Sequence, residues 1–81
     1  VEAVARGRVE YAGELAGYGN CIIINHGDGY YTLYARTGNI FISKGDIVEM
    51  GAVVAETAAG SNFHFELRKS KQSMDPESWI R

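Results

Sequence analysis

Two histidines are the residues of this 81-residue chain best suited to bind a metal or to act as a base near neutral pH. His64 lies between two phenylalanines in SNFHFELR, and His26 lies in NHGDG, where we predict a polar cap on a turn. Zinc needs three or four ligands, and Glu66 is the one further candidate close to His64. A catalytic triad would need a nucleophile beside His64, but alternation along an extended strand puts Ser61 on the opposite face. By spacing alone, the sequence contains no convincing metal site or catalytic set.

The elements that must position His64 are predicted to be two β-strands, each with one polar face. Alternation along residues 62–68 separates a predicted core face of Phe63, Phe65 and Leu67 from a polar face of Asn62, His64, Glu66 and Arg68. Along residues 30–36 it separates Tyr31, Leu33 and Ala35 from Tyr30, Thr32, Tyr34 and Arg36. The two polar faces can meet as one groove, or each can be an ordinary solvated surface.

The chain as a whole is predicted to be a single all-β domain. Ten glycines and one proline separate short apolar runs, and Asp28-Gly29 is a strong signal for a two-residue hairpin turn. This pattern favours a small antiparallel β-sheet or sandwich built of hairpins, with helix limited to one turn that begins at Pro76. The single cysteine, Cys21, flanks an isoleucine run and is predicted to be a buried thiol.

Charge and hydropathy argue against several kinds of partner. The net charge is −2, from 8 basic and 10 acidic residues, and no basic stripe is present, so we expect no nucleic-acid binding. No apolar run reaches the ~20 residues of a membrane span, so we expect no membrane contact by this domain. The stretch GDIVEMGAVVAET resembles a lipoyl- or biotin-carrier hairpin, but Lys44 in SKGD lacks the setting of a carrier lysine.

Four stretches run in order over essentially the whole chain: GRVEYAGELAGYGNCIIINHGDGYYTLYAR, SKGDIVEMGAVVAE, FHFELRK and DPESWI. Together they resemble the LytM/lysostaphin-type (peptidase M23-like) peptidoglycan endopeptidases. The resemblance implies a LytM-type (duplicated hybrid motif-like) antiparallel sheet around a zinc groove. In that family a His-x-His strand supplies a zinc ligand, which His64 matches, and a catalytic histidine, whose position here is Asn62. Another catalytic histidine of the family falls at Arg36.

The resemblance also implies that this site has lost its chemistry. Arginine stays protonated and asparagine does not titrate, so neither Arg36 nor Asn62 replaces a catalytic imidazole. The family's other zinc ligands belong to a His-x-x-x-Asp motif upstream of the first matched strand. We therefore expect residues 1–81 to be one degenerate domain that forms the C-terminal part of a longer envelope protein. This domain is expected to lack the upstream His-x-x-x-Asp segment. We expect no catalytic residue, no zinc and no other cofactor.

Degenerate relatives of this kind include the EnvC-like murein hydrolase activators. By resemblance we expect a non-catalytic, extracytoplasmic regulatory module of bacterial cell-wall remodelling, which binds a protein such as a peptidoglycan amidase, or peptidoglycan itself. The expected binding groove consists of Tyr30, Thr32, Tyr34, Arg36, Asn62, His64 and Glu66. The alternative is a zinc metalloendopeptidase that cleaves peptidoglycan crosslinks and takes its remaining ligands from outside this chain.

Overall fold

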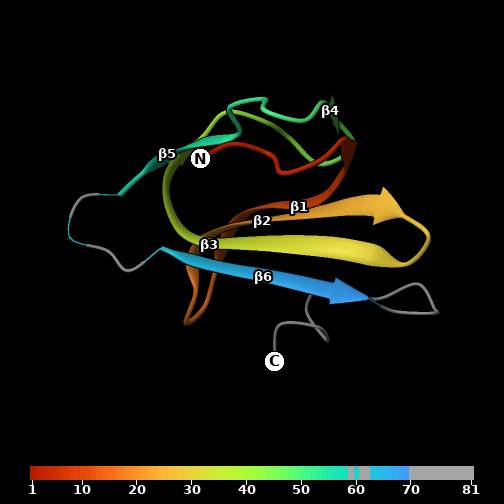
Figure 1. The fold of residues 1–81 in the computed structure, drawn as a ribbon. Helices are drawn as coiled ribbons and strands as arrows, with labels where there is room; N and C mark the ends of the chain where they lie inside the picture. Colours follow the sequence, from red (N-terminus) through yellow and green to blue (C-terminus); the bar gives the residue numbers. More distant parts are fainter. Residues whose placement is uncertain (59, 61–62, 70–81) are drawn as a thin grey trace.

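The computed structural model describes residues 1–58, 60 and 63–69, and all regular secondary structure among them is β-strand (Figure 1). The strands are β1 Gly7–Leu15, β2 Gly19–Gly27, β3 Tyr30–Ile40, β4 Ile47–Val48, β5 Ala55–Thr57 and β6 His64–Lys69. The predicted all-β fold is confirmed, whereas the helical turn predicted at Pro76 lies outside the described residues. No helix in the part of the chain that the structure describes is long and apolar enough to cross a membrane.

The strands form one antiparallel sheet in the order β4-β1-β2-β3-β5, and β6 pairs with β3 beside this path. Strands β5 and β6 share the same edge of β3, because β6 pairs with residues 30–35 and β5 with Thr37 and Ile40. Figure 1 shows β3 bending away from β6 toward β5 and the N-terminal segment. The sheet is therefore curled, and the bend lies at the point where the partner of β3 changes.

The hairpin between β2 and β3 turns at Asp28 and Gly29, as predicted. Asp28 has φ 53° and Gly29 has φ 79°, so both residues are in the left-handed region that a type I′ turn requires. The turn is capped by Asn25, whose Oδ1 accepts a hydrogen bond from the Gly27 N–H at 2.9 Å. His26, which we predicted as the cap, forms its hydrogen bonds elsewhere.

Both faces of the central strands are buried, which explains the uninterrupted apolar run in β2. On one face, Ile22 and Ile24 pack in a first core cluster that also contains Ala3, Val9, Tyr34, Val48, Val54 and Ala55. On the other face, Ile23 and Cys21 pack in a second core cluster with Tyr31, Leu33 and Ala35. The predicted burial of the Cys21 thiol is confirmed, since Cys21 is fully inaccessible.

The prediction that Phe63, Phe65 and Leu67 belong to the core is wrong. These side chains are 46 %, 42 % and 62 % exposed. The residues that close the first core cluster over β1–β3 come from the N-terminal segment and from the β4–β5 region. Phe65 packs edge-to-face against the Tyr34 ring, with ring centroids 5.4 Å apart, and lines an open pocket with Phe63 and the N-terminal segment.

Candidate functional site

A β-bulge in β3 places Arg36 in the candidate site. The pairing of β3 with β2 shifts between Tyr34 and Thr37, where two residues of β3 oppose one residue of β2. Arg36 takes the left-handed conformation there, with φ 59°, and its backbone N–H donates to the carbonyl of Tyr18 at 3.1 Å. The bulge breaks the alternation of side chains, so Arg36 no longer follows Thr32 and Tyr34 onto their face of the sheet. A pocket of about 270 Å³ is lined by Tyr18, Arg36, His64 and Glu66.

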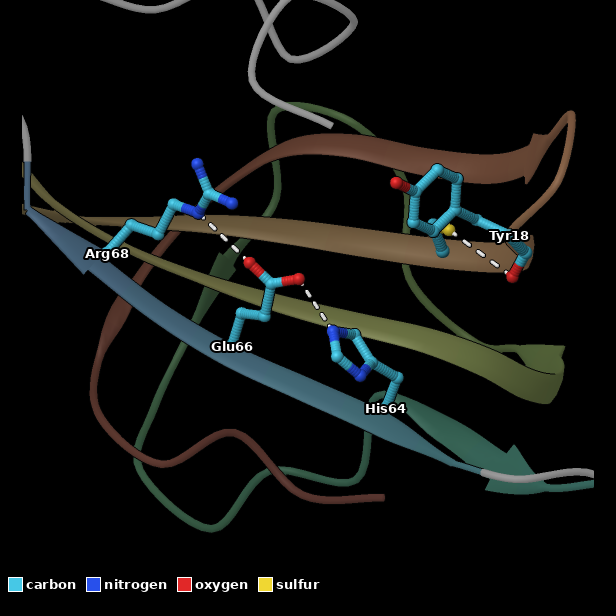
Figure 2. Close-up of polar contacts among 5 residues, drawn as sticks. Tyr18, His64, Glu66 and Arg68 are labelled. Carbon is cyan, nitrogen blue, oxygen red and sulfur yellow. Dashed lines mark hydrogen bonds and ion pairs between the residues drawn. The ribbon is translucent and has the colours of Figure 1, made fainter. Parts of the chain in front are cut away.

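The side chains of β6 that face this pocket form a local network (Figure 2). Glu66 lies between His64 and Arg68, which share its face because they are two residues away along the strand. Its Oε2 is 2.6 Å from His64 Nε2, and its Oε1 accepts from Arg68 Nε at 2.9 Å. The hydrogen bond from His64, followed by the contact with Arg68, lowers the pKa of the Glu66 carboxyl below its ordinary value of 4.5. The carboxylate form of Glu66 is therefore held in place by two neighbours.

The turn between β1 and β2 closes the opposite side of the pocket. Tyr18 lies there between two glycines in GYGN, and its carbonyl accepts from the Arg36 N–H and from the Cys21 thiol. Figure 2 shows the second of these two contacts. Burial raises the pKa of Cys21 to about 11, although Arg36 opposes this shift. Sequence reasoning missed Tyr18, because a turn residue is brought to β6 only by the three-dimensional arrangement of the hairpin.

The predicted groove residues do not all lie on one face of the sheet. The structure brings Arg36, His64 and Glu66 together, and it leaves Asn62 outside the described residues. The inclusion of Thr32 and Tyr34 is wrong: the residues of β3 opposite His64 and Glu66 are Ala35 and Leu33, so the intervening side chains lie on the other face.

Three predicted groove residues, Tyr30, Thr32 and Tyr34, lie on the face of β3 opposite to His64 and Glu66, and they differ in exposure. Thr32 is 0 % and Tyr34 is 1 % exposed, so neither offers surface to a partner. Tyr30 is 40 % exposed and carries the Lys69 ammonium 4.8 Å from its ring centroid. The bulge changes the face of Arg36 and of the residues after it, but of none before it, so strict alternation wrongly groups Arg36 with Thr32 and Tyr34.

A buried polar chain connects Thr32 and Tyr34 to the N-terminal segment. Thr32 Oγ1 donates to the Tyr34 hydroxyl at 3.2 Å, and the same hydroxyl accepts from the Val4 N–H at 3.2 Å. His26 Nε2 is hydrogen-bonded to Thr32 Oγ1 at 2.7 Å, and its Nδ1 donates to the Arg6 carbonyl at 2.9 Å. Both ring nitrogens of His26 are thus used to hold the N-terminal segment against the sheet.

The donors of the pocket do not fit a zinc ion. Within the described residues, no group of three or more His, Cys, Asp and Glu side chains is arranged to hold a metal. His64 and Glu66 are two of the three or four ligands that zinc needs, and they are hydrogen-bonded to each other. The Arg36 guanidinium, which is always charged, lines the same pocket and would repel a dication. The arrangement is better suited to binding a carboxylate than to binding a metal.

Comparison with known proteins gives concordant matches. The model of Peptidase family M23 matches residues 1–76. The chain is 39 % identical over 85 residues to the outer membrane antigenic lipoprotein B of Haemophilus influenzae, with 99 % of this chain and 21 % of that protein covered. It is 32 % identical over 85 residues to the murein hydrolase activator EnvC of Escherichia coli, with 99 % of this chain and 20 % of EnvC covered. The chain thus spans about a fifth of the length of these curated relatives.

The fold is similar to that of a solved protein complex. The structure of the SpoIIQ-SpoIIIAH pore forming complex contains a chain that superposes with a TM-score of 0.75 at 26 % identity. The superposition covers 94 % of this chain and 52 % of that chain.

Proposed function

Because this chain belongs to peptidase family M23, we propose that it is a non-catalytic binding and regulatory module of bacterial cell-wall remodelling. In this proposal it activates a peptidoglycan amidase by binding it at the pocket of Tyr18, Arg36, His64 and Glu66. The observation that carries the proposal is Arg36, which occupies a position expected for a catalytic histidine and lines the pocket beside the one family zinc ligand that is matched, His64.

Loss of catalysis follows from the chemistry of the substitutions. Hydrolysis at a metal centre needs a metal-activated water and groups that accept and donate protons around it. Arg36 only donates, and Asn62 does not titrate. Both carboxylate oxygens of Glu66 are engaged in hydrogen bonds, one with His64 and one with Arg68, so Glu66 is not free to serve as a base. We therefore propose that the chain neither holds zinc nor cleaves peptidoglycan.

A pocket without catalysis still offers a recognition site. The Arg36 side chain is exposed and makes no ion pair with any residue that the structure describes, while Glu66 is already paired. The guanidinium therefore remains available for a bidentate contact with a carboxylate of the partner. Tyr18 adds an aromatic wall beside it, and arginine and tyrosine are enriched among residues that dominate binding energy.

The known relatives support a protein partner outside the cytoplasm. EnvC carries the name murein hydrolase activator, and the Haemophilus relative is named as an outer membrane lipoprotein. The solved neighbour is titled as a complex of two proteins. We accordingly place this chain in the cell envelope as a module that acts through contact with another protein.

Amidase activation in solution tests the proposal. A purified envelope amidase would be incubated with peptidoglycan and the wild-type chain, Arg36→Glu or Lys44→Glu, and the released fragments measured. Arg36→Glu should weaken binding and activation about 30-fold or more, the effect of losing a hot spot of ~2 kcal/mol. Lys44→Glu makes the same charge change at an exposed residue that is not among those lining the pocket and should behave like wild type.

Two outcomes would contradict the proposal. Activation by Arg36→Glu at the wild-type level would remove the pocket from the interface. Chelator-sensitive cleavage of cell walls by the chain alone would instead establish the alternative, a zinc metalloendopeptidase.

A further inference from the structure

A second pocket lies near the end of the sheet remote from Arg36. It measures about 420 Å³, and its walls include Arg6, Arg8, Asn25 and Ile47. Arg8 of β1 is directly opposite Asn25 of β2 and Ile47 of β4. Directly opposed residues share a face with Cβ atoms ~5 Å apart, so these three side chains converge over one patch of the sheet.

The free polar groups of this pocket are hydrogen-bond donors. Arg8 makes no ion pair or side-chain hydrogen bond with any described residue. Arg6 uses its Nε to bind Glu49 at 2.9 Å, and its guanidinium makes no other hydrogen bond or ion pair with a described residue. Asn25 commits its Oδ1 to the Gly27 N–H, which leaves the Nδ2 amino group. His26 also lines the pocket but has both ring nitrogens engaged.

The backbone beneath these donors is fixed by close packing. A Cβ at Gly7, between the two arginines, would lie 2.5 Å from Ile24 Cγ2 and 2.9 Å from His26 Nδ1. Glycine is therefore required where β1 enters the sheet, and it holds Arg6 and Arg8 on either side of a tight contact. Ile47 is 57 % exposed and forms an apolar wall beside the donors.

We propose that this pocket binds the carboxylate of a short peptide. Arg8 supplies the principal bidentate contact, the Asn25 amide and the Arg6 guanidinium add donors, and an apolar side chain of the peptide packs against Ile47. A guanidinium fork suits phosphate as well, but an apolar wall next to the fork matches an amino-acid carboxylate. Arg8 pairs with Asn25, which pairs with Tyr31 of β3, whereas His64 pairs with Ala35 of the same strand. Tyr31 and Ala35 are four residues, or ~13 Å, apart along β3. The proposal thus concerns a separate site and does not depend on the proposed function.

Nuclear magnetic resonance titration of the ¹⁵N-labelled chain tests this site. The probes are N-acetyl-leucine and N-acetyl-leucinamide, which differ in the carboxylate alone. The acid should shift the amide signals of Gly7 and Gly27 and the Asn25 side-chain signals, whereas the amide should not. Arg8→Gln should weaken binding of the acid about tenfold, since a hydrogen bond to a charged group contributes on that order. Lys44→Gln, an exposed change of equal charge outside this pocket, should leave it unchanged.

A second variant keeps the test decisive if Arg8→Gln perturbs the sheet. Asn25→Asp retains the oxygen that caps the turn but places a negative charge beside the ligand, so it should abolish the shifts. Equal shifts with the acid and the amide, or unchanged affinity in both variants, would overturn the proposal. Tighter binding of inorganic phosphate than of N-acetyl-leucine would overturn the assignment to a peptide carboxylate. None of these measurements involves an amidase, so they remain independent of the Arg36 pocket.

Discussion

Tyr34→Phe should destabilise the domain without affecting partner binding. Its hydroxyl accepts from Val4 N–H and from Thr32 Oγ1, each at 3.2 Å, and the side chain is 1 % exposed. A typical hydrogen bond contributes ~0.5–1.5 kcal/mol, and the half-exposed Val4 can recover part of its loss from water. The free energy of unfolding should therefore fall by ~1–2 kcal/mol. For a domain of this size that corresponds to a Tm lower by ~5–15 °C.

Urea and thermal unfolding of the wild type, Tyr34→Phe and the matched control Tyr30→Phe would measure this. Tyr30 is 40 % exposed and its hydroxyl has no hydrogen bond to a described residue, so its change should stay within ~0.5 kcal/mol. Adding Thr32→Val to Tyr34→Phe should cost less than the sum of the two single changes, because both interrupt one network. If Tyr34→Phe were as stable as the control but lost partner binding, Tyr34 would be a surface residue and the assigned register of β6 would be wrong.

Three further results are expected. The Cys21 thiol, with its pKa raised to about 11 by burial, should react with a disulfide reagent at pH 8 far more slowly in the native chain than in urea. Folding lowers the pKa of Glu66, so its carboxylate stabilises the folded state above the ordinary pKa of 4.5, and this contribution is lost as the pH falls through the lower folded pKa. The difference in urea midpoint between the wild type and Glu66→Gln should therefore shrink over that acidic range alone. Arg36→Gly should change the free energy of unfolding by less than ~1 kcal/mol, since glycine accepts φ 59° without strain, while removing the guanidinium and hence amidase activation.

Local signals in the sequence were sufficient to predict most of the fold. The Asp28-Gly29 pair specifies a type I′ turn by its backbone preferences, and this turn sets the pairing of β2 with β3. The isoleucine run beside Cys21 predicts a buried thiol, and Cys21 is fully inaccessible. The exposure of Phe63 and Phe65 could not be predicted in this way, because alternation gives the face of a side chain but not what covers that face.

The candidate site was less predictable than the fold, for a physical reason that is visible in β3. Strict alternation assigns Arg36 to the face of Tyr34, and on that assumption the groove was extended to Thr32 and Tyr34. The actual register pairs Ala35 with His64, which moves both of those side chains to the opposite face. A one-residue bulge is a tertiary feature, because it depends on the partner strands on both sides of β3.

The same bulge connects the structure to the proposed function. Without it, Arg36 would project onto the face of the first core cluster, and the pocket would lack this arginine. The bulge requires a left-handed conformation, which costs a non-glycine residue ~1 kcal/mol relative to glycine. An arginine is found there nonetheless, with its N–H bound to Tyr18 and its side chain beside His64. A costly conformation that brings one charged residue to one pocket supports the proposal that its guanidinium binds a ligand there, and the ligand that fits a guanidinium is a carboxylate, such as that of an acidic residue of a partner.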